Sequence, residues 1–208
     1  AVSHILPKRF ANEVLPVLYN SWEATEFNVS EKGQLELAKT AAEIGCELFV
    51  MDDGWFSTRL SDNAGLGDWE VNRDKFPNGL KPLIDGVNAL EMDFGIWVEP
   101  EMVNPRSELY KKHPDWTYNY ESRTPSLLRH QLVLNMTKPE VKEYVFGFLD
   151  KLLSENNIKY IKWDMNRPFS ETGTDNLENG KELWYRHSQA IYSIVDQLKE
   201  KHPDVQFE

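Results

Sequence analysis

The stretch LFVMDDGW at residues 48–55 joins four apolar residues to a polar turn that begins with two aspartates. Apolar runs of this length, without alternation, are typical of a strand that is buried on both faces of a parallel sheet. An amphipathic segment precedes the run, with Ser30 placed as a helix N-cap and Gly45 placed to end the helix. A helix followed by a buried strand is the repeating unit of an α/β fold.

The same combination of a short apolar run and a longer amphipathic segment recurs along the chain. A capping box at Thr137-Lys-Pro-Glu140 predicts one further helix start, and an apolar stripe over 183–198 predicts another helix. We predict strands over Val14–Tyr19, Leu48–Asp53, Asp93–Glu99, Gln131–Met136 and Ile158–Asp164, and the beginning of a sixth over Val205–Glu208. Because an eight-stranded barrel typically takes ~250 residues, we expect an α/β fold, namely a (β/α)8 TIM barrel present as an incomplete barrel of about six βα units. The absence of any linker-like segment favours a single domain over residues 1–208.

Composition and charge narrow the classes of partner. The 208 residues include 34 acidic and 23 basic ones, which opposes binding to the phosphates of nucleic acid. No run approaches the ~20 consecutive apolar residues of a membrane-spanning helix, and the N-terminus AVSHILPKRF lacks the pattern of a signal peptide. The one cysteine, Cys46, cannot form an internal disulfide. We expect a cytoplasmic protein without nucleic-acid or membrane partners, and the open sheet edges of an incomplete barrel favour a homo-oligomer.

Polar and aromatic residues gather where the predicted strands end. They are Asn20-Ser-Trp22-Glu23, Asp52-Asp53-Gly54-Trp55, Trp97-Val-Glu99-Pro-Glu101, Asn135 and Lys162-Trp-Asp164-Met-Asn166. The carboxyl ends of parallel strands meet at one rim, where α/β barrels carry their chemistry. Each motif alone also fits a structural role, since an Asp-Asp-Gly run fits a turn and tryptophan fits a core. Their coincidence at one rim favours a functional site.

Side-chain alternation indicates which of these residues face the barrel lumen. Lys162 and Asp164 share one face of their strand, and by the same parity Trp97, Glu99 and Glu101 share one face of theirs. A lysine beside Asp164 would lower the pKa of that carboxyl and keep it ionised, as a nucleophile requires. Asp164 is therefore our candidate nucleophile.

The chemistry of this rim suits a sugar. Carboxylates and cations hydrogen-bond hydroxyl groups, and the apolar face of a sugar ring stacks on tryptophan. The five histidines are scattered without the spacing of a metal site, and no glycine-rich phosphate loop occurs. We expect no metal and no cofactor.

Five runs of residues carry a resemblance to a known family. They are Trp22-Glu-Ala-Thr-Glu-Phe27, Met51-Asp-Asp-Gly-Trp55, Gly67-Asp-Trp69, Trp97-Val-Glu-Pro-Glu-Met102 and Lys162-Trp-Asp-Met-Asn166. In this order they make nearly the whole chain similar to the catalytic domain of the α-galactosidases of glycoside hydrolase family 36. The resemblance implies a retaining hydrolase that cleaves terminal α-linked galactose from oligosaccharides such as melibiose or raffinose through a covalent glycosyl-enzyme.

The resemblance also implies roles for individual residues. Asp164 matches the nucleophile, and Lys162 and Asn166 match polar contacts around it. Asp52 and Asp53 match a pair that binds galactose hydroxyls, and Trp22 and Trp97 match the walls of the galactose pocket. Arg129 matches a substrate-contacting position. A strand over Gln131–Met136 would instead place Arg129 before the strand, at the opposite rim.

The resemblance is incomplete. The family carries its general acid/base on a later barrel strand, beyond a glycine-rich segment, and a large β domain before the barrel, and residues 1–208 contain neither. A retaining mechanism needs two carboxyl groups about 5–5.5 Å apart. We therefore expect a truncated catalytic domain that is inactive as an isolated chain.

Two other classes of function also fit the sequence. Carboxylates that end successive strands, namely Asp52, Glu99 and Asp164, could ligate Mg²⁺ in a metal-dependent barrel enzyme. Inhibition by a chelator would distinguish that enzyme from a glycosidase. A partial barrel could also be a non-catalytic carbohydrate-binding unit.

Overall fold

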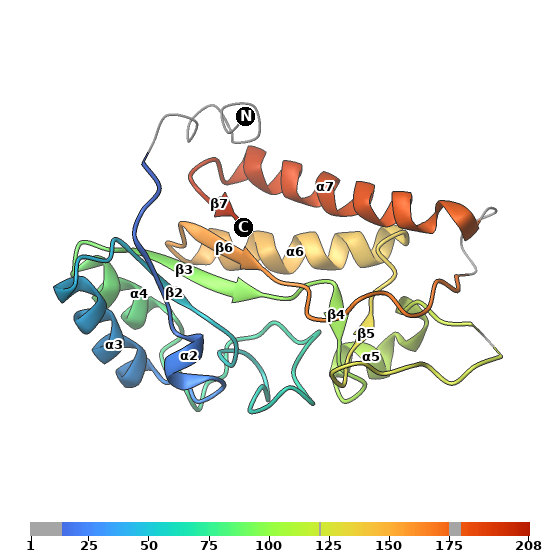
Figure 1. Ribbon diagram of the computed structural model, residues 1–208, viewed down its shortest axis with the longest axis horizontal. Coiled ribbons are helices and arrows are strands. Elements are labelled where there is room, and N and C mark those ends of the chain that lie inside the picture. The colour runs from blue at the N-terminus through green and yellow to red at the C-terminus, as the bar shows by residue number, and fades with distance from the viewer. Residues whose placement is uncertain (1–13, 121, 175–179) are drawn as a thin grey trace.

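The computed structural model describes residues 14–120, 122–174 and 180–208 (Figure 1). Five strands form one parallel sheet in the order β1-β2-β3-β6-β7, so that β3 lies in the middle. These strands are β1 (Leu18–Asn20), β2 (Leu48–Met51), β3 (Asp93–Val98), β6 (Tyr160–Trp163) and β7 (Gln206–Phe207). β1 and β7 each keep one edge that no strand of the described chain pairs. The sheet is therefore an open part of a βα barrel, as the sequence predicts, but the described residues supply five barrel strands and not six.

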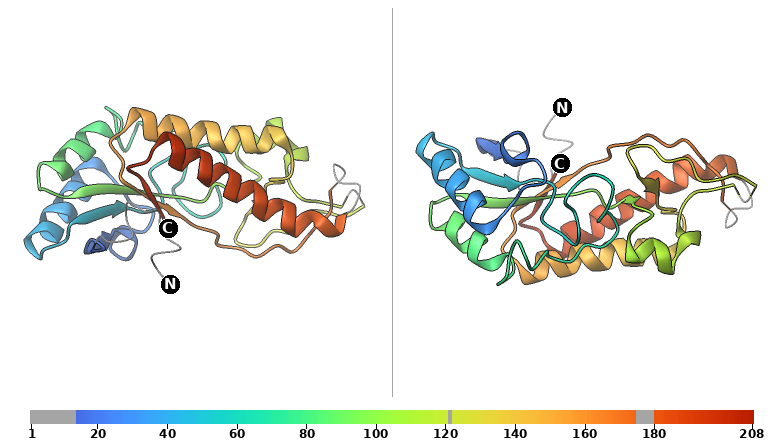
Figure 2. Two further views of the ribbon diagram at one scale, coloured as in Figure 1. Left: turned by 90° about the horizontal axis from the view of Figure 1, so that it is seen from above. Right: turned by 90° about the horizontal axis from the view of Figure 1, so that it is seen from below.

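Helices connect consecutive strands. The connection from β1 to β2 contains α2 (Trp22–Thr25) and α3 (Glu31–Glu43), and the connection from β2 to β3 contains α4 (Lys81–Asn88). The helix before β6 is α6 (Pro139–Glu155). The connection from β6 to β7 contains a 3₁₀ turn (Gly180–Glu182) and α7 (Leu183–Lys201). α6 and α7 pack side by side over the β6 and β7 end of the sheet, whereas α3 and α4 pair at its other end (Figures 1 and 2). Across the described residues, no helix is both long and apolar enough to cross a bilayer.

The two predicted helix caps have different outcomes. Ser30 caps α3 as predicted, because its hydroxyl oxygen accepts a hydrogen bond from the Gly33 amide at 3.2 Å. The predicted capping box at Thr137–Glu140 is wrong. α6 begins at Pro139 after Lys138, and no side chain caps it. The Thr137 hydroxyl instead donates to the side-chain oxygen of Asn135.

The predicted fourth barrel strand is also wrong. Within 131–136 only β5 (Leu132–Val133) is a strand, and it pairs antiparallel with β4 (Met102–Val103) in a separate two-stranded sheet. It cannot join β3, because β6 already occupies that edge through the pairing of Ile96 with Ile161. Residues 99–138 therefore form an excursion between β3 and α6, which also carries α5 (Glu108–Lys112) and a 3₁₀ turn (Pro114–Trp116).

The core of the molecule lies around β2 and β3. Every residue of β2 is buried, and Phe94 and Ile96 of β3 are fully enclosed. Gly95 lies between them, where a Cβ would come within 2.9 Å of Val50 Cγ2 and 3.0 Å of Tyr160 Cβ. The middle strand thus approaches its neighbours closely at this position.

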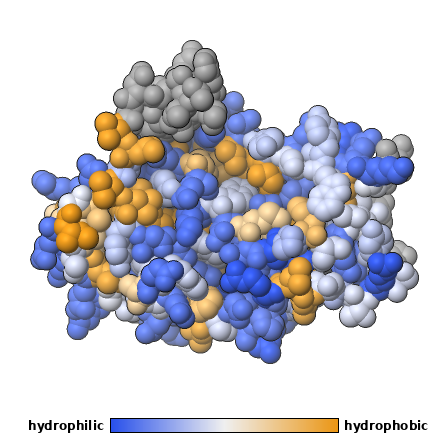
Figure 3. Space-filling model, viewed as in Figure 1, coloured by the Kyte–Doolittle hydropathy of each residue, from blue (hydrophilic) through white to orange (hydrophobic). Residues whose placement is uncertain are grey.

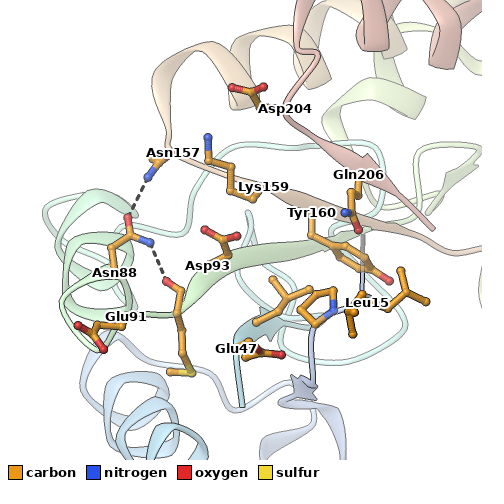
Figure 4. Close-up of a pocket in the computed structure, with 14 residues that line it drawn as sticks. Leu15, Glu47, Asn88, Glu91, Asp93, Asn157, Lys159, Tyr160, Asp204 and Gln206 are labelled. Atoms are coloured by element: carbon orange, nitrogen blue, oxygen red, sulfur yellow. Dashed lines mark hydrogen bonds between the residues drawn. The ribbon is translucent and has the colours of Figure 1, made fainter. Parts of the chain in front are cut away.

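A cavity of about 710 Å³ lies at the amino ends of the strands (Figure 4). Acidic side chains, including Glu47, Glu91 and Asp93, line it together with Lys159, and an amide pair joins Asn157 to Asn88 at 2.9 Å. Barrel enzymes carry their chemistry at the opposite, carboxyl rim.

We predict that Gly95→Ala lowers the free energy of unfolding by about 1–3 kcal/mol, because the added methyl group overpacks the sheet. Gly147→Ala is the matched control, since Gly147 lies on α6 and a methyl group added there would meet no atom within 4 Å. In a helix this control should raise stability by about 0.5–1 kcal/mol. Urea unfolding measures both. Equal effects of the two substitutions would contradict the close packing at Gly95.

Candidate active site

One cavity of about 230 Å³ at the carboxyl rim is lined by all eight predicted site residues. They are Trp22, Asp52, Asp53, Trp97, Arg129, Lys162, Asp164 and Asn166. Six of them lie in or shortly after β2, β3 or β6, Trp22 begins α2 after β1, and Arg129 comes from the excursion. The parallel sheet brings together residues up to 144 positions apart (166 minus 22), because the carboxyl ends of its strands lie side by side.

Asp164 is held by three N–H donors. Its Oδ2 accepts hydrogen bonds from Trp97 Nε1 at 3.0 Å and from Asn166 Nδ2 at 2.7 Å, and its Oδ1 accepts one from the Met165 amide at 2.9 Å. The Asp164 amide donates to the Val98 carbonyl at 2.8 Å, which ties the residue to β3. A carboxylate that accepts from donors on both oxygens is fixed in orientation.

Lys162 does not act as the sequence suggests. We expected it to pair with Asp164, but its Nζ donates to Asp52 Oδ2 at 2.8 Å. The physical reason is that β2 and β6 flank β3, and side chains from alternate strands of a barrel share a layer. Asn20 Nδ2 donates to the same Asp52 oxygen at 2.6 Å, and Asn20 Oδ1 accepts from the Trp22 amide at 2.8 Å.

Asp53 forms a buried ion pair that sequence reasoning missed. Arg59 Nε lies 2.9 Å from Asp53 Oδ1, and Arg59 Nη2 lies 2.7 Å from Oδ2, so the guanidinium holds both oxygens. Arg59 is only 1% exposed. Burial raises the pKa of the Asp53 carboxyl, and the hydrogen bonds and charge of Arg59 oppose that shift. The local signal was weak, because a lone arginine in a loop is usually solvated.

Glu99 and Glu101 do not line the cavity, contrary to the parity expectation. The reason is that β3 ends at Val98, so strand alternation does not extend to these residues. Burial raises the pKa of the Glu99 carboxyl to about 7, and the charge of Asp164 adds to this shift. Glu101 accepts from Trp163 Nε1 at 2.9 Å and lies 2.6 Å from His187 Nε2 on α7.

Arg129 lies at the carboxyl rim and not at the opposite one. The expectation of the opposite rim depended on a barrel strand over 131–136, and that strand belongs instead to the excursion. A tight turn between Leu128 and Gln131 carries Arg129 to the cavity.

The three carboxylates proposed for a magnesium site are engaged in other contacts. Asp52 pairs with Lys162, Glu99 accepts from Gln131 Nε2 at 3.2 Å, and Asp164 accepts from indole and amide donors. Among the residues that the structure describes, no group of three or more His, Cys, Asp or Glu side chains is placed to hold a metal ion.

This cavity combines an oriented carboxylate, two further carboxylates, two indoles and two cations at the carboxyl rim of a parallel sheet, which is where proteins of the TIM-barrel class carry their sites. Comparison with known proteins gives the family. The chain belongs to the melibiase family, whose sequence profile matches residues 1–208.

Individual relatives agree with this assignment. The chain is 45% identical over 201 residues to the α-galactosidase AgaA of Geobacillus stearothermophilus, covering 96% of this chain and 28% of AgaA. It is 42% identical to α-galactosidase 2 of Hypocrea jecorina, covering 99% of this chain and 28% of that one. The chain thus spans between a quarter and a third of the length of these relatives.

Solved structures give the same result. The crystal structure of AgaA, a family 36 α-galactosidase, superposes with a TM-score of 0.91 at 44% identity, covering 95% of this chain and 28% of that one. The α-galactosidase of Lactobacillus brevis superposes with a TM-score of 0.92 at 41% identity, covering 97% and 27%. The resemblance to glycoside hydrolase family 36 and the incomplete barrel are confirmed.

We predict that Arg59→Met lowers the free energy of unfolding by about 3–5 kcal/mol, because it leaves the Asp53 carboxyl buried without its cation. Arg186→Met is the matched control. Arg186 pairs with Glu182 at 3.2 Å on the exposed surface of the helix start, and its loss should cost no more than about 0.5 kcal/mol. Chemical unfolding of the two variants measures the difference. A small effect of Arg59→Met would show that the Asp53 pair is not a structural requirement of the rim.

Proposed function

We propose that this chain forms the nucleophile-bearing part of a retaining α-galactosidase. The observation that carries the proposal is the single cavity in which Trp97 and Asn166 orient Asp164 beside Asp52 and Asp53. Relatives support the substrate class, because structures of AgaA variants have been solved in complex with raffinose, with stachyose and with 1-deoxygalactonojirimycin. The substrate would be the terminal α-linked galactose of such oligosaccharides.

The proposed reaction proceeds in two displacements. A carboxylate oxygen of Asp164 forms a bond to the anomeric carbon, and the bond from that carbon to the glycosidic oxygen breaks with its electron pair on the oxygen, which takes a proton from a general acid. Water, deprotonated by the same group acting as a base, then attacks the anomeric carbon. Galactose leaves and Asp164 returns to the carboxylate form.

The other cavity residues would bind the sugar. Asp52 and Asp53 accept hydrogen bonds from galactose hydroxyls, and their cationic partners Lys162 and Arg59 keep both side chains in place. The rings of Trp22 and Trp97 would form apolar walls for the sugar. A site whose buried acceptors lose their partners with the wrong sugar discriminates strongly against it.

The general acid is not among the cavity carboxyls that we assign. Asp52 is bonded to Lys162, and both oxygens of Asp53 are bonded to Arg59, so neither is free to carry the proton for the leaving group. In the family resemblance this group lies on a later strand. We therefore propose that residues 1–208 alone bind galactosides without hydrolysing them.

We predict that an α-galactose-configured cyclophellitol-type inactivator labels Asp164, because this carboxylate is oriented toward the cavity by its donors. Peptide mapping of the protein at its natural length locates the label. Asp164→Asn should not be labelled, and Glu101→Gln, whose carboxyl lies outside the cavity, should be labelled at the wild-type rate. The α-glucose-configured probe should react at least about 100-fold more slowly.

A label on Glu99 instead of Asp164 would overturn the assignment of the nucleophile. Equal rates for the two probes would contradict the assignment of the sugar.

We predict that the purified 208-residue chain releases no galactose from melibiose above background. General acid assistance contributes roughly 10²–10⁴-fold in rate, and a natural leaving group depends on it most. The measurement compares galactose release by the wild-type chain and by Asp164→Ala at equal concentration. Release that disappears in Asp164→Ala would show that a carboxyl within these residues supplies the proton.

We also propose that the isolated chain self-associates. β1 and β7 each have an unpaired edge within the described sheet, and Val14, Leu15 and Val17 beside β1 are exposed. Figure 3 shows apolar surface on this side of the molecule, where the chain enters β1. Light scattering should show a mass that rises with concentration, and Leu15→Lys should reduce the rise. A constant monomer mass would contradict the proposal.

The single cysteine supports a reducing, cytoplasmic setting, which we propose as the location. Cell fractionation tests it.

A further inference from the structure

Arg129 reaches the cavity from a turn with an unfavourable backbone conformation. The Gln131 amide donates to the Leu128 carbonyl at 3.0 Å, and φ is +51° at Arg129 and +59° at His130. Both central residues of the turn are therefore left-handed, a conformation that favours Asn-Gly and that disfavours residues with larger side chains. Such a turn persists only where surrounding contacts hold it.

Three buried side chains hold this turn. Asn104 Nδ2 donates to the His130 carbonyl at 2.8 Å, and Arg167 Nη1 donates to the Gln131 carbonyl at 2.6 Å. The third contact is made by the side chain of Gln131 itself, whose Nε2 donates to Glu99 Oε2 at 3.2 Å. Glu99, Asn104 and Gln131 are fully buried. Glu99 is the acidic acceptor among the side chains that hold this turn.

The second oxygen of Glu99 holds a different loop. Its Oε1 accepts a hydrogen bond from the Asn166 amide, and the side chain of Asn166 donates to Asp164 Oδ2 at 2.7 Å. One carboxyl group behind the cavity therefore connects the turn that presents Arg129 with the loop that presents Asn166. Glu99 does not itself line the cavity.

We propose that Glu99 is a positioning residue for the candidate active site, which fixes Arg129 through Gln131 and fixes Asn166 through its backbone amide. This inference rests on the proposed function, because Arg129 and Asn166 would contact the galactoside or its nucleophile. Through these two residues Glu99 would set the affinity for the sugar without touching it.

Three substitutions separate positioning from a general effect on folding. Glu99→Ala removes both contacts. Glu99→Gln keeps one side-chain oxygen, which can still accept from the Asn166 backbone amide. Its new side-chain NH2 group can donate to Gln131 Oε1 if the side-chain amide of Gln131 rotates by 180°. Gln131 Oε1 is a buried atom without a hydrogen-bond partner in the described structure. Glu101→Gln is the matched control, since Glu101 is a buried acid two positions away that contacts Trp163 and His187 instead.

The kinetic experiment measures KM and kcat for an aryl α-galactoside with the protein at its natural length. Glu99→Ala should raise KM by about 10–100-fold, Glu99→Gln by less than about 10-fold, and Glu101→Gln should leave KM unchanged. A smaller folded fraction alone would lower the apparent kcat and leave KM as it is. An unchanged KM in Glu99→Ala, or an equal rise in Glu101→Gln, would overturn the inference.

Gln131→Ala provides a second test at the other end of the same contact, in case Glu99→Ala does not fold. Gln131→Ala should raise KM by about 10-fold. When Glu99→Gln is combined with Gln131→Ala, the second substitution should raise KM by less than about 2-fold more, because the effects of substitutions at two residues in contact do not add. Fully additive effects would show that Glu99 does not act through Gln131.

Amide hydrogen exchange tests positioning without a ligand. Glu99→Ala and Gln131→Ala should each accelerate exchange at the Gln131 backbone amide at least about 10-fold, and Glu101→Gln should not. Failure of the wild-type protein to bind or cleave galactosides would refute the proposed function, whereas unchanged exchange in both variants would refute the positioning role. The two failures are therefore distinguishable.

Discussion

The pairing of β3 with β2 on one side and with β6 on the other is the constraint on which the rest of the structure depends. The register places Met51 beside Ile96 and Trp97 beside Lys162, so that Asp52, which follows β2, comes level with Lys162, and Asp164 follows two residues later at the same rim. A shift of one residue would turn every side chain of a strand to its other face. Because β2 and the greater part of β3 are buried in the core, such a shift would also expose apolar surface. The apolar residues thereby fix the position of the polar ones.

The three carboxylates that line the cavity differ in the charge of their partners. Asp52 and Asp53 are each bonded to a cation, Lys162 and Arg59, and these pairs hold them as fixed acceptors. Asp164 accepts from the neutral donors of Trp97, Met165 and Asn166. Neutral donors orient a carboxylate and leave its charge uncompensated by a bonded cation, which suits attack on a carbon that develops positive charge. In the proposed function, environment and not residue type divides the aspartates into binding groups and a nucleophile.

The parts of the site that could be predicted from sequence are the parts determined by local signals. A buried apolar run that ends in Asp52-Asp53 or in Lys162-Trp-Asp164 reveals both the strand and its polar end. The role of Arg59 and the positions of Glu99 and Glu101 could not be predicted in this way. They depend on the residue at which β3 ends and on contacts between residues that are 6 to 86 positions apart in the sequence. The strand expected over 131–136 failed for the same reason. Its apolar residues fit a barrel strand equally well, and only the occupied edge of β3 excludes them.

The excursion from 99 to 138 gives the site a wall that the barrel strands do not supply. It contributes Arg129 to the cavity, and it is anchored by buried side chains rather than by the parallel sheet. Residues of a barrel strand are constrained on both faces, so their substitution disturbs the core along with the site. A turn held by a few hydrogen bonds is freer to change, provided that its anchors remain. The wall that carries Arg129 is therefore separable from the strand register that positions Asp164.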